Sequence, residues 1–358
     1  MNGLALRLIE DAEGFASAWA ESAADIDVSP FLSATWVLAR LETAPDGSAP
    51  FGVFNGERPL GLVFARRGRG GAVRLHLHET GVPEADAVYA EDVDFLAGPN
   101  DALRTAIFDL LIERKPVALV ARTLSKRCYS VLVERAQQSA YAARKTDEKT
   151  AYAVDLDALR ASGADFASTL SAGARRQSRR AEELLGAVRF NRADTVERRR
   201  AYSDALEALH AVRWKRKGRD GAFANPAFRR FHEALRRACD EKPDWGLDYS
   251  FDALVAEEEI VGVLYQLHWR GGVYNYQTGF RVFDDNRVKP GLVAHRLAAE
   301  CAREEGAARY DLLAGGGVYK ERLAAPHRMV VSTVFERRGP LQWARAVARA
   351  AKNALRRG

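Results

Sequence analysis

One segment near the carboxyl end of the chain, residues 273–323, restricts the possible folds more than any other. It begins with an aromatic, β-favouring run at 273–280, breaks at a polar turn, and continues as a helix that starts at residues 290–291. A short apolar run at 310–313 and three successive glycines follow. This order predicts a β-α-β unit whose turn feeds a helix N-terminus, where free N–H groups and the helix dipole favour an anion. An ordinary crossover with a polar turn is equally compatible with the pattern.

The composition is typical of a globular chain with two domains. The chain has 358 residues, of which 47 % are hydrophobic, and no apolar run approaches the about 18 residues of a membrane-spanning helix. The first residues carry acidic side chains and no apolar block, so they do not resemble a signal peptide, and the cytoplasm is the expected location. The 3 cysteines and 7 histidines show no ligand spacing, so neither a disulfide scaffold nor a metal site is expected.

Positive charge is concentrated in one part of the chain. Residues 171–219 contain 14 Lys and Arg against 6 Asp and Glu, a local net charge of +8, whereas the whole chain carries +6. This predicts an anionic ligand or a surface that meets one. Within the region, Arg176 and Arg180 lie on one stripe of a predicted helix and suit phosphates, while Trp214 stands among cations and could stack on a base or sugar. The alternatives are a solvated helix face and a helix-end tryptophan that covers the core.

The chain reads as two halves of one kind. Each half is predicted to contain helices, an antiparallel meander, a helix and a closing strand, which indicates an α/β fold with a mixed, mostly antiparallel sheet. The expected domains are residues 1–145 and 146–340, joined by a polar linker at 142–150. In the first half, Asn55 and Gly56 predict a hairpin turn, and a strand is expected at 88–96.

The last segment, residues 341–358, predicts an amphipathic helix. Its basic side chains share one face and its apolar side chains the other; the basic ones are Arg345, Arg349, Lys352 and Arg356. Such a helix would rest on an anionic membrane surface or dock on its own domain.

Several segments of the second half occur in an order found in a known family. These segments are 171–181, 210–214, 228–231, 276–280, 290–292, 310–313 and 319–320. In this order they resemble the GNAT acyltransferase superfamily, and specifically its CelD-type branch, whose two tandem GNAT-like domains are similar to those of the Fem aminoacyltransferases. The first half matches more weakly, through 29–31 and Trp36, and its turn at 98–100 has no basic residue. The resemblance therefore implies two tandem GNAT-like domains, of which the first has lost donor binding.

The resemblance also implies a site for acetyl-CoA or another acyl-CoA, which would bind as a substrate and not as a permanent cofactor. The superfamily places the diphosphate on the turn before the helix and an oxyanion donor near the end of the preceding strand. The matching positions are Arg287, Val288, Lys289 and Gly291 for the turn, and Gln277 and Gly279 for the strand. The turn is one residue longer than usual and contains Pro290, which has no N–H, so one phosphate contact is missing or replaced.

Amide formation from a thioester needs a neutral amine, a donor for the developing oxyanion and an acid for the departing thiolate. The superfamily often places an acidic tyrosine after the next strand, and Tyr319 is the matching candidate. Lys320 would hold a phosphate or carboxylate, and Asp311 would act as a base through water or anchor Lys320. Tyr276, together with Trp214, Arg176 and Arg180, would contact the substrate. For Tyr319 the alternative is a ring that packs under the glycine run.

Three functions fit these expectations. The first is an N-acyltransferase that moves an acyl group from acyl-CoA to a primary amine by direct attack, with an amino sugar or another small amine of envelope or exopolysaccharide metabolism as acceptor. The second replaces the donor with aminoacyl-tRNA, which the basic region and the altered turn favour. The third is a non-catalytic scaffold that binds a polyanion or a membrane. The acyl group, the acceptor and the oligomeric state do not follow from the sequence.

Overall fold

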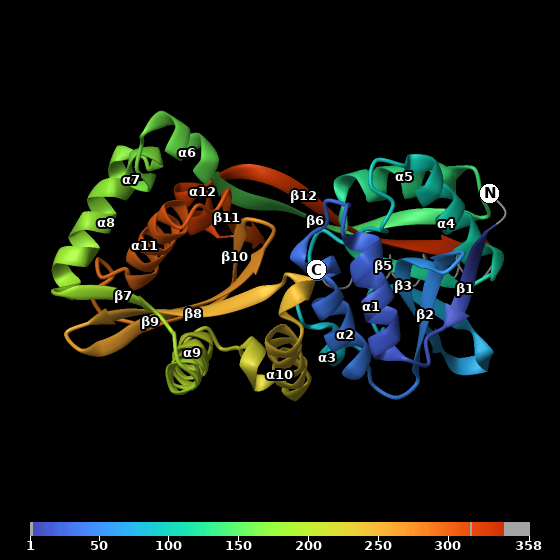
Figure 1. Cartoon of the computed structure of the whole chain (residues 1–358), viewed down its shortest axis with the longest axis horizontal. Helices are drawn as coiled ribbons and strands as arrows, with labels where there is room; N and C mark the ends of the chain where they lie inside the picture. Colours follow the sequence, from blue (N-terminus) through green and yellow to red (C-terminus); the bar gives the residue numbers. More distant parts are fainter. Residues whose placement is uncertain (1–2, 316, 340–358) are drawn as a thin grey trace, which may run out of the picture. The chain divides into compact units, whose positions relative to one another are not determined.

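The computed structural model describes residues 3–315 and 317–339 (Figure 1). Its contacts divide the chain into two compact units, one formed by residues up to 148 together with those from 330 on, and one formed by residues 149–329. Each unit contains a mixed, mostly antiparallel sheet with flanking helices, which confirms the predicted fold class. The amphipathic helix expected at 341–358 lies outside the described residues.

The first unit combines an antiparallel meander with one parallel strand pair. Its strands follow the order β1-β2-β3-β4-β5-β12; β4 and β5 run parallel, and the other neighbours antiparallel. Its elements are β1 (Leu4–Leu8), α1 (Ala12–Ala23), α2 (Ala34–Glu42), β2 (Ser48–Asn55), β3 (Arg58–Arg67), β4 (Val73–Leu77), α3 (Pro83–Asp86), α4 (Asp101–Glu113), β5 (Ala118–Ser125), α5 (Lys126–Gln137) and most of β12 (Ala325–Arg337).

Two expectations for this unit had different outcomes. The hairpin turn is confirmed, because Gly56 has a positive φ of 61° between the paired strands β2 and β3. The strand expected at 88–96 is wrong, since a single bridge between Val93 and Leu124 is what the segment contributes to the sheet. Tyr89 and Asp92 have φ values of 51° and 56°, and such left-handed residues interrupt an extended strand.

The polar run at 142–150, expected as a linker, lies inside strand β6 (Tyr141–Asp155). In the first unit, the Tyr141 hydroxyl donates to the Pro116 carbonyl over 2.6 Å. In the second unit, Ala151 and Ala153 pair with β11 (Arg309–Ala314). Partners that are distant in sequence thus hold this stretch extended despite its polar composition, because pairing and packing outweigh intrinsic β-propensity.

The second unit repeats the arrangement of a meander and one parallel pair. Its strands follow the order β6-β11-β10-β9-β8-β7, and β10 and β11 run parallel. Its further elements are α6 (Leu156–Ser162), α7 (Phe166–Thr169), α8 (Ala172–Leu185), β7 (Val188–Arg192), α9 (Val196–Lys215), α10 (Pro226–Glu241), β8 (Asp248–Ala256), β9 (Glu259–Trp269), β10 (Gly272–Phe280), α11 (Pro290–Glu304) and α12 (Val318–Leu323). The segment 166–185 thus forms two helices, α7 and α8, and Ser171 caps α8 by accepting from the Ala174 N–H at 3.2 Å.

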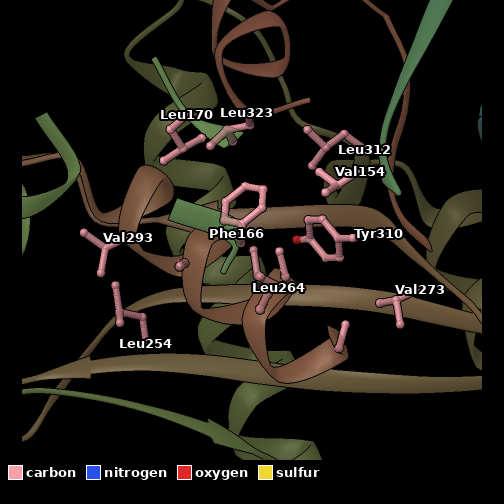
Figure 2. Packing of buried hydrophobic residues seen from close by; sticks show 14 of the residues in the cluster. Val154, Phe166, Leu170, Leu254, Leu264, Val273, Val293, Tyr310, Leu312 and Leu323 are labelled. Atoms are coloured by element: carbon pink, nitrogen blue, oxygen red, sulfur yellow. The ribbon is translucent and has the colours of Figure 1, made fainter. Parts of the chain in front are cut away.

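Helices cover both faces of this second sheet. In Figure 1, α8 and α11 lie on one face, and α9 and α10 lie on the other. On the α11 face, Tyr310 and Val273 of the sheet pack with Phe166 and Val293 of the helices in one apolar cluster (Figure 2). Burying apolar side chains of this kind is the main stabilising contribution to such a layered fold.

The two parallel strands of the second unit separate before they end. Their pairing stops at Tyr274 and Asp311, although β10 continues to Phe280. The helix α11 connects β10 to β11 and begins beside the separated ends. This opening provides the place for a site.

Among the described residues, no helix has both the length and the apolar character needed to cross a bilayer.

Candidate active site

A cleft of about 310 Å³ lies at the end of β10, beside the N-terminus of α11. Its lining comes from α8, α9, the end of β10, the following segment, α11 and α12. The apolar lining residues are Phe280, Val282, Phe283, Val288, Pro290, Leu292 and Leu323, and the remaining ones are Gln177, Arg213, Thr278, Arg281, Lys289, Gly291, His295, Tyr319 and Arg322. The cleft therefore combines an apolar wall with several cations.

The charges that line the cleft have one sign. Its described lining residues include four Arg or Lys side chains and no carboxylate. Gln177 Oε1 accepts hydrogen bonds from Lys289 Nζ and Arg322 Nη1, both at 3.3 Å, so one neutral oxygen holds two cations together. Arg281 pairs with Glu259 outside the cleft. Cations gathered around a concave, partly apolar surface create a potential that attracts an anion.

The first turn of α11 adds to this positive potential. Lys289 is the N-cap residue and makes no side-chain capping hydrogen bond, and Pro290 occupies the first helical position. The N–H that proline lacks would have no partner within the helix in any case, so proline is tolerated there. Gly291 lies close to Phe280, since an added Cβ would approach its ring to 3.0 Å. This turn therefore presents the positive end of the helix dipole at the cleft.

Arg287 is placed differently from its neighbours in the predicted turn. Its Nη2 lies 2.7 Å from Asp285 Oδ2, and its backbone N–H also binds that carboxylate at 2.9 Å. The hydrogen bonds from Arg287 lower the pKa of Asp285 to about 2. Val288, Lys289 and Gly291 line the cleft, whereas Arg287 does not.

Tyr319 lies on the cleft wall, at the start of α12. Its side chain is 38 % exposed, and its ring stacks on that of His295 with centroids 5.6 Å apart. Desolvation raises the pKa of Tyr319, an effect that Arg213 opposes. The phenol therefore keeps its proton at neutral pH, as an acid for a departing thiolate must.

Lys320 and Asp311 are engaged within the fold. Lys320 Nζ donates to the Leu313 and Ala314 carbonyls at 3.1 and 2.8 Å. Asp311 is fully buried, accepts from the Leu313 N–H at 2.7 Å and pairs with Arg328. Neither side chain lines the cleft. These contacts indicate that both residues stabilise the end of β11, where Leu313 has a φ of 62°.

The residues expected to contact substrate lie outside the cleft. Tyr276 is buried, and its hydroxyl lies 3.1 Å from His232 Nε2. Trp214 is half-buried; its ring packs on His210, with centroids 5.8 Å apart, and Lys217 Nζ lies 4.9 Å from its centre. Arg176 and Arg180 are exposed on α8, and Arg180 pairs with Glu183 at 3.2 Å.

The expected oxyanion donors lie on an irregular part of β10. The pairing register shifts between Asn275 and Gln277, which marks a bulge. Gly279 has a packing reason to be glycine, because an added Cβ would approach the Leu206 carbonyl of α9 to 2.6 Å. Gln277 and Gly279 are thus next to the cleft residues Thr278 and Phe280 in sequence but do not line it.

Several cleft residues were missed by the sequence reasoning. Arg213 adjoins Trp214, and its guanidinium carbon lies 5.9 Å from the centre of the Phe280 ring. Gln177 lies in sequence between Arg176 and Arg180, the two arginines that the sequence predicts as substrate contacts. Helical periodicity could have found Arg213, which lies three residues after the buried His210 and seven after Leu206. No local signal distinguishes His295 or Arg322.

Among the described residues, no group of three or more His, Cys, Asp or Glu side chains could hold a metal ion.

Comparisons with known proteins agree with the observed fold. Residues 169–321 match the family model of the acetyltransferase (GNAT) domain. A comparison with curated proteins finds no match.

Solved structures of similar fold include three that cover most of this chain. A conserved protein of unknown function from Bacteroides thetaiotaomicron is 12 % identical, with a TM-score of 0.58, over 93 % of this chain and 100 % of its own. FemX is 10 % identical, with a TM-score of 0.54, over 88 % and 95 %. A tandem GNAT protein from the clavulanic acid biosynthesis pathway is 13 % identical, with a TM-score of 0.50, over 94 % and 99 %. At these identities the similarity shows the fold alone.

Proposed function

Because residues 169–321 form a GNAT acetyltransferase domain, we propose that this GNAT-type acyltransferase takes an acyl group from acyl-CoA and transfers it to a primary amine. The basic cleft with its apolar wall carries this proposal. Coenzyme A joins a diphosphate to a long, flexible thioester arm, and a cleft of this kind offers a matching surface to each part.

The diphosphate would lie at the N-terminus of α11. There Lys289 and Arg322 are held together by Gln177, and the helix dipole favours negative charge. Arg213 supplies a third cation across the cleft. The thioester arm would follow the apolar wall at Phe280 and Leu292.

The reaction is proposed to proceed by direct attack within a ternary complex. The neutral amine attacks the acyl carbon, and a backbone N–H near the β10 bulge, at Gln277–Gly279, stabilises the oxyanion. The C–S bond then breaks, and the thiolate takes the proton of Tyr319, while the amine proton passes to water. In this proposal, Lys320 and Asp311 position α12 and the end of β11.

The acceptor is proposed to be a small primary amine such as an amino sugar. The first unit is proposed not to bind the donor, and the segment 341–358 is proposed to contact a membrane surface. The three free cysteines fit a reducing compartment such as the cytoplasm.

Aminoacyl-tRNA is the second candidate donor. The exposed arginines of α8, Arg176 and Arg180, would extend the basic cleft surface towards a longer polyanion. The similarity of fold to FemX makes this candidate specific enough to test, and a non-catalytic scaffold is the third outcome.

Calorimetric titration with coenzyme A, acetyl-CoA and longer acyl-CoAs, each at 50 and 200 mM salt, tests the proposal. We expect binding that Lys289→Ala weakens and that the matched control Arg127→Ala, in the first unit, leaves unchanged. Binding of tRNA that falls by orders of magnitude between the two salt concentrations, without binding of any coenzyme A thioester, would favour the second donor. If neither a coenzyme A thioester nor tRNA binds, the remaining candidate is the non-catalytic scaffold.

A further inference from the structure

We propose that His295 is a catalytic residue, whose Nε2–H donates a hydrogen bond to the acyl carbonyl oxygen as that oxygen gains negative charge. This role rests on the proposed transfer from a thioester in the same cleft. It adds a side-chain donor to the backbone donor of β10.

The ring of His295 is fixed in the wall of the cleft. The residue lies in the second turn of α11, is 2 % exposed, and contributes to the cleft lining. Its ring stacks on Tyr319 at an interplanar angle of 17° and meets Phe280 edge-on, with centroids 5.9 Å apart. The imidazole therefore lies directly beside the proposed acid.

Hydrogen bonds behind the ring determine which nitrogen carries the proton. Gln266 Nε2 donates to the Tyr310 hydroxyl oxygen at 3.5 Å, and the same hydroxyl lies 2.9 Å from His295 Nδ1. Within the described part of the chain, Nδ1 is the acceptor available to the Tyr310 hydroxyl proton. Since a buried hydroxyl rarely leaves its proton unused, we infer that Nδ1 accepts this proton and that the imidazole proton is on Nε2, the nitrogen left for the cleft.

This group lies where the two parallel strands separate. Tyr310 stands opposite Val273, one pair before the pairing ends at Tyr274 and Asp311. Asn275 follows immediately on β10, opposite Gln266, and its buried Oδ1 has no hydrogen-bond partner among the described residues. Polar groups thus lie at the strand opening, and one of them, Asn275 Oδ1, accepts no hydrogen bond from a described residue. That is the environment in which a polar reaction centre can be desolvated.

The charge state of the ring suits a hydrogen-bond donor and not a base. Burial, together with the charges of Lys320 and Arg213, lowers the pKa of His295 to about 3. Burial also raises the pKa of the Tyr310 hydroxyl, so this partner keeps its proton too. A neutral imidazole can stabilise an oxyanion while it retains its own proton.

The step then balances without a further reactant. The nitrogen of the amine forms a bond to the acyl carbon, and the carbonyl electron pair moves to the oxygen that Nε2–H holds. When that pair returns, the C–S bond breaks and sulfur takes the Tyr319 proton. The amine releases one proton to water, and the Tyr319 phenolate takes one back from water, so both Tyr319 and His295 are unchanged at the end.

Two substitutions separate a catalytic role from a structural one. His295→Leu keeps the approximate volume and removes the donor, so we expect kcat to fall about 10²–10³-fold, as for the loss of one oxyanion donor. His295→Gln places an amide N–H near the position of Nε2 and should recover most of that loss. The dissociation constant for acyl-CoA should change less than about threefold in both variants.

A loss that Gln does not recover, or one that resides in acyl-CoA affinity, would overturn the proposal. A measurement that needs no turnover complements this: ¹⁵N-detected NMR of the imidazoles should find His295 neutral with its proton on Nε2 at pH 7. A proton found on Nδ1 would overturn the proposal. In Tyr310→Phe, the imidazole proton should no longer favour Nε2. Wild-type protein that binds no acyl-CoA would overturn the proposed function itself, and wild-type turnover that His295→Leu leaves intact would overturn this role alone.

Discussion

The two units each have a pocket beside the helix that joins their parallel strands, but the two pockets differ in charge. In the second unit, four cations and no carboxylate line the cleft at α11. In the first unit, a pocket of about 390 Å³ at α4 is lined by four aspartates and two arginines, which are Asp25, Asp27, Asp92, Asp94, Arg104 and Arg127. The same topology thus presents opposite surfaces to a ligand.

The helix N-termini differ in the same direction. The amide oxygen of Asn100 caps α4 by accepting from the Leu103 N–H at 2.9 Å, and Asp101 adds a carboxylate in the first turn. The first turn of α11 has neither a capping side chain nor an acid. The dipole of α4 is therefore compensated by its own residues, whereas that of α11 remains available to an external anion.

The arginines of the two pockets also differ in their partners. Arg104 binds Asp94 through two hydrogen bonds of 2.9 and 3.0 Å. Arg213, Lys289 and Arg322 form no ion pair with a described carboxylate. An arginine that a neighbouring carboxylate neutralises supports the fold, and a cation without such a partner supports binding. Topology therefore does not predict which unit binds the donor.

The largest expected effect concerns the cleft cations. Arg213→Ala combined with Lys289→Ala should weaken acyl-CoA binding about 10³-fold, because each charge-assisted hydrogen bond contributes on the order of 2 kcal/mol. Calorimetric titration measures this. The double variant Lys215→Ala with Arg219→Ala removes equal charge from exposed positions outside the cleft and should change the affinity less than tenfold. Equal losses in both would mean that net charge alone attracts the donor.

The next largest effect is a loss of stability on removing Arg104, the arginine of the first unit that Asp94 neutralises. Arg104→Leu leaves the largely buried Asp94 without its partner, which should cost about 3 kcal/mol of unfolding free energy. Chemical denaturation measures the loss, and acyl-CoA affinity should stay within about twofold of wild type. Arg127→Leu, at a half-exposed pair with Asp101, should cost less than about 1 kcal/mol. A loss of donor affinity in Arg104→Leu would contradict the assignment of donor binding to the second unit.

A smaller effect follows from the crowding of acids in the first unit. Burial and the nearby Asp86 raise the pKa of Glu79 to about 7, although Arg122 and Arg40 oppose the shift. Because the folded pKa exceeds the unfolded one, stability is fully present below about pH 4.5 and is lost as the pH rises through about 7. Glu79→Gln should therefore gain about 3 kcal/mol over wild type at pH 8 and nothing at pH 4.5. The control Glu57→Gln, at an exposed position, should show no such pH dependence in denaturation curves.

The smallest effect is expected at Arg287, which the family resemblance places in the turn that binds the diphosphate. Arg287→Ala should change acyl-CoA affinity less than about threefold, because the guanidinium is exposed and bound to Asp285. Asp285→Asn releases this arginine and should increase affinity slightly in the same titration. A tenfold loss in Arg287→Ala would mean that the arginine exchanges Asp285 for the donor on binding.

Most of the second unit follows from local sequence pattern. The strand β10, the helix α11 and the strand β11 were predicted within a few residues, because alternation and helical periodicity are local properties. The helix start at residues 290–291 was predicted as well, since proline and glycine restrict the start of a helix. In the first unit, Asn55 and Gly56 specified their hairpin for the same reason.

Tertiary contacts decided the rest. The stretch at 142–150 is polar and still extended, because strand partners far along the chain hold it. Lys320 and Asp311 carry reactive groups, yet backbone carbonyls, a backbone N–H and Arg328 engage them. Residue type alone does not reveal whether a charge is already neutralised inside the fold.

The amino-acid sequence was sufficient for the order of the elements, the two similar halves and the basic turn at the start of α11, because backbone preferences and apolar spacing act over a few residues. The folded chain was required for three contacts. It places Arg213, and not Trp214, in the cleft, and it pairs Arg287 with Asp285. It also brings His295 against Tyr310 and Tyr319. Each of these depends on distances between segments that are remote in sequence, and such distances are set by packing and not by local preference.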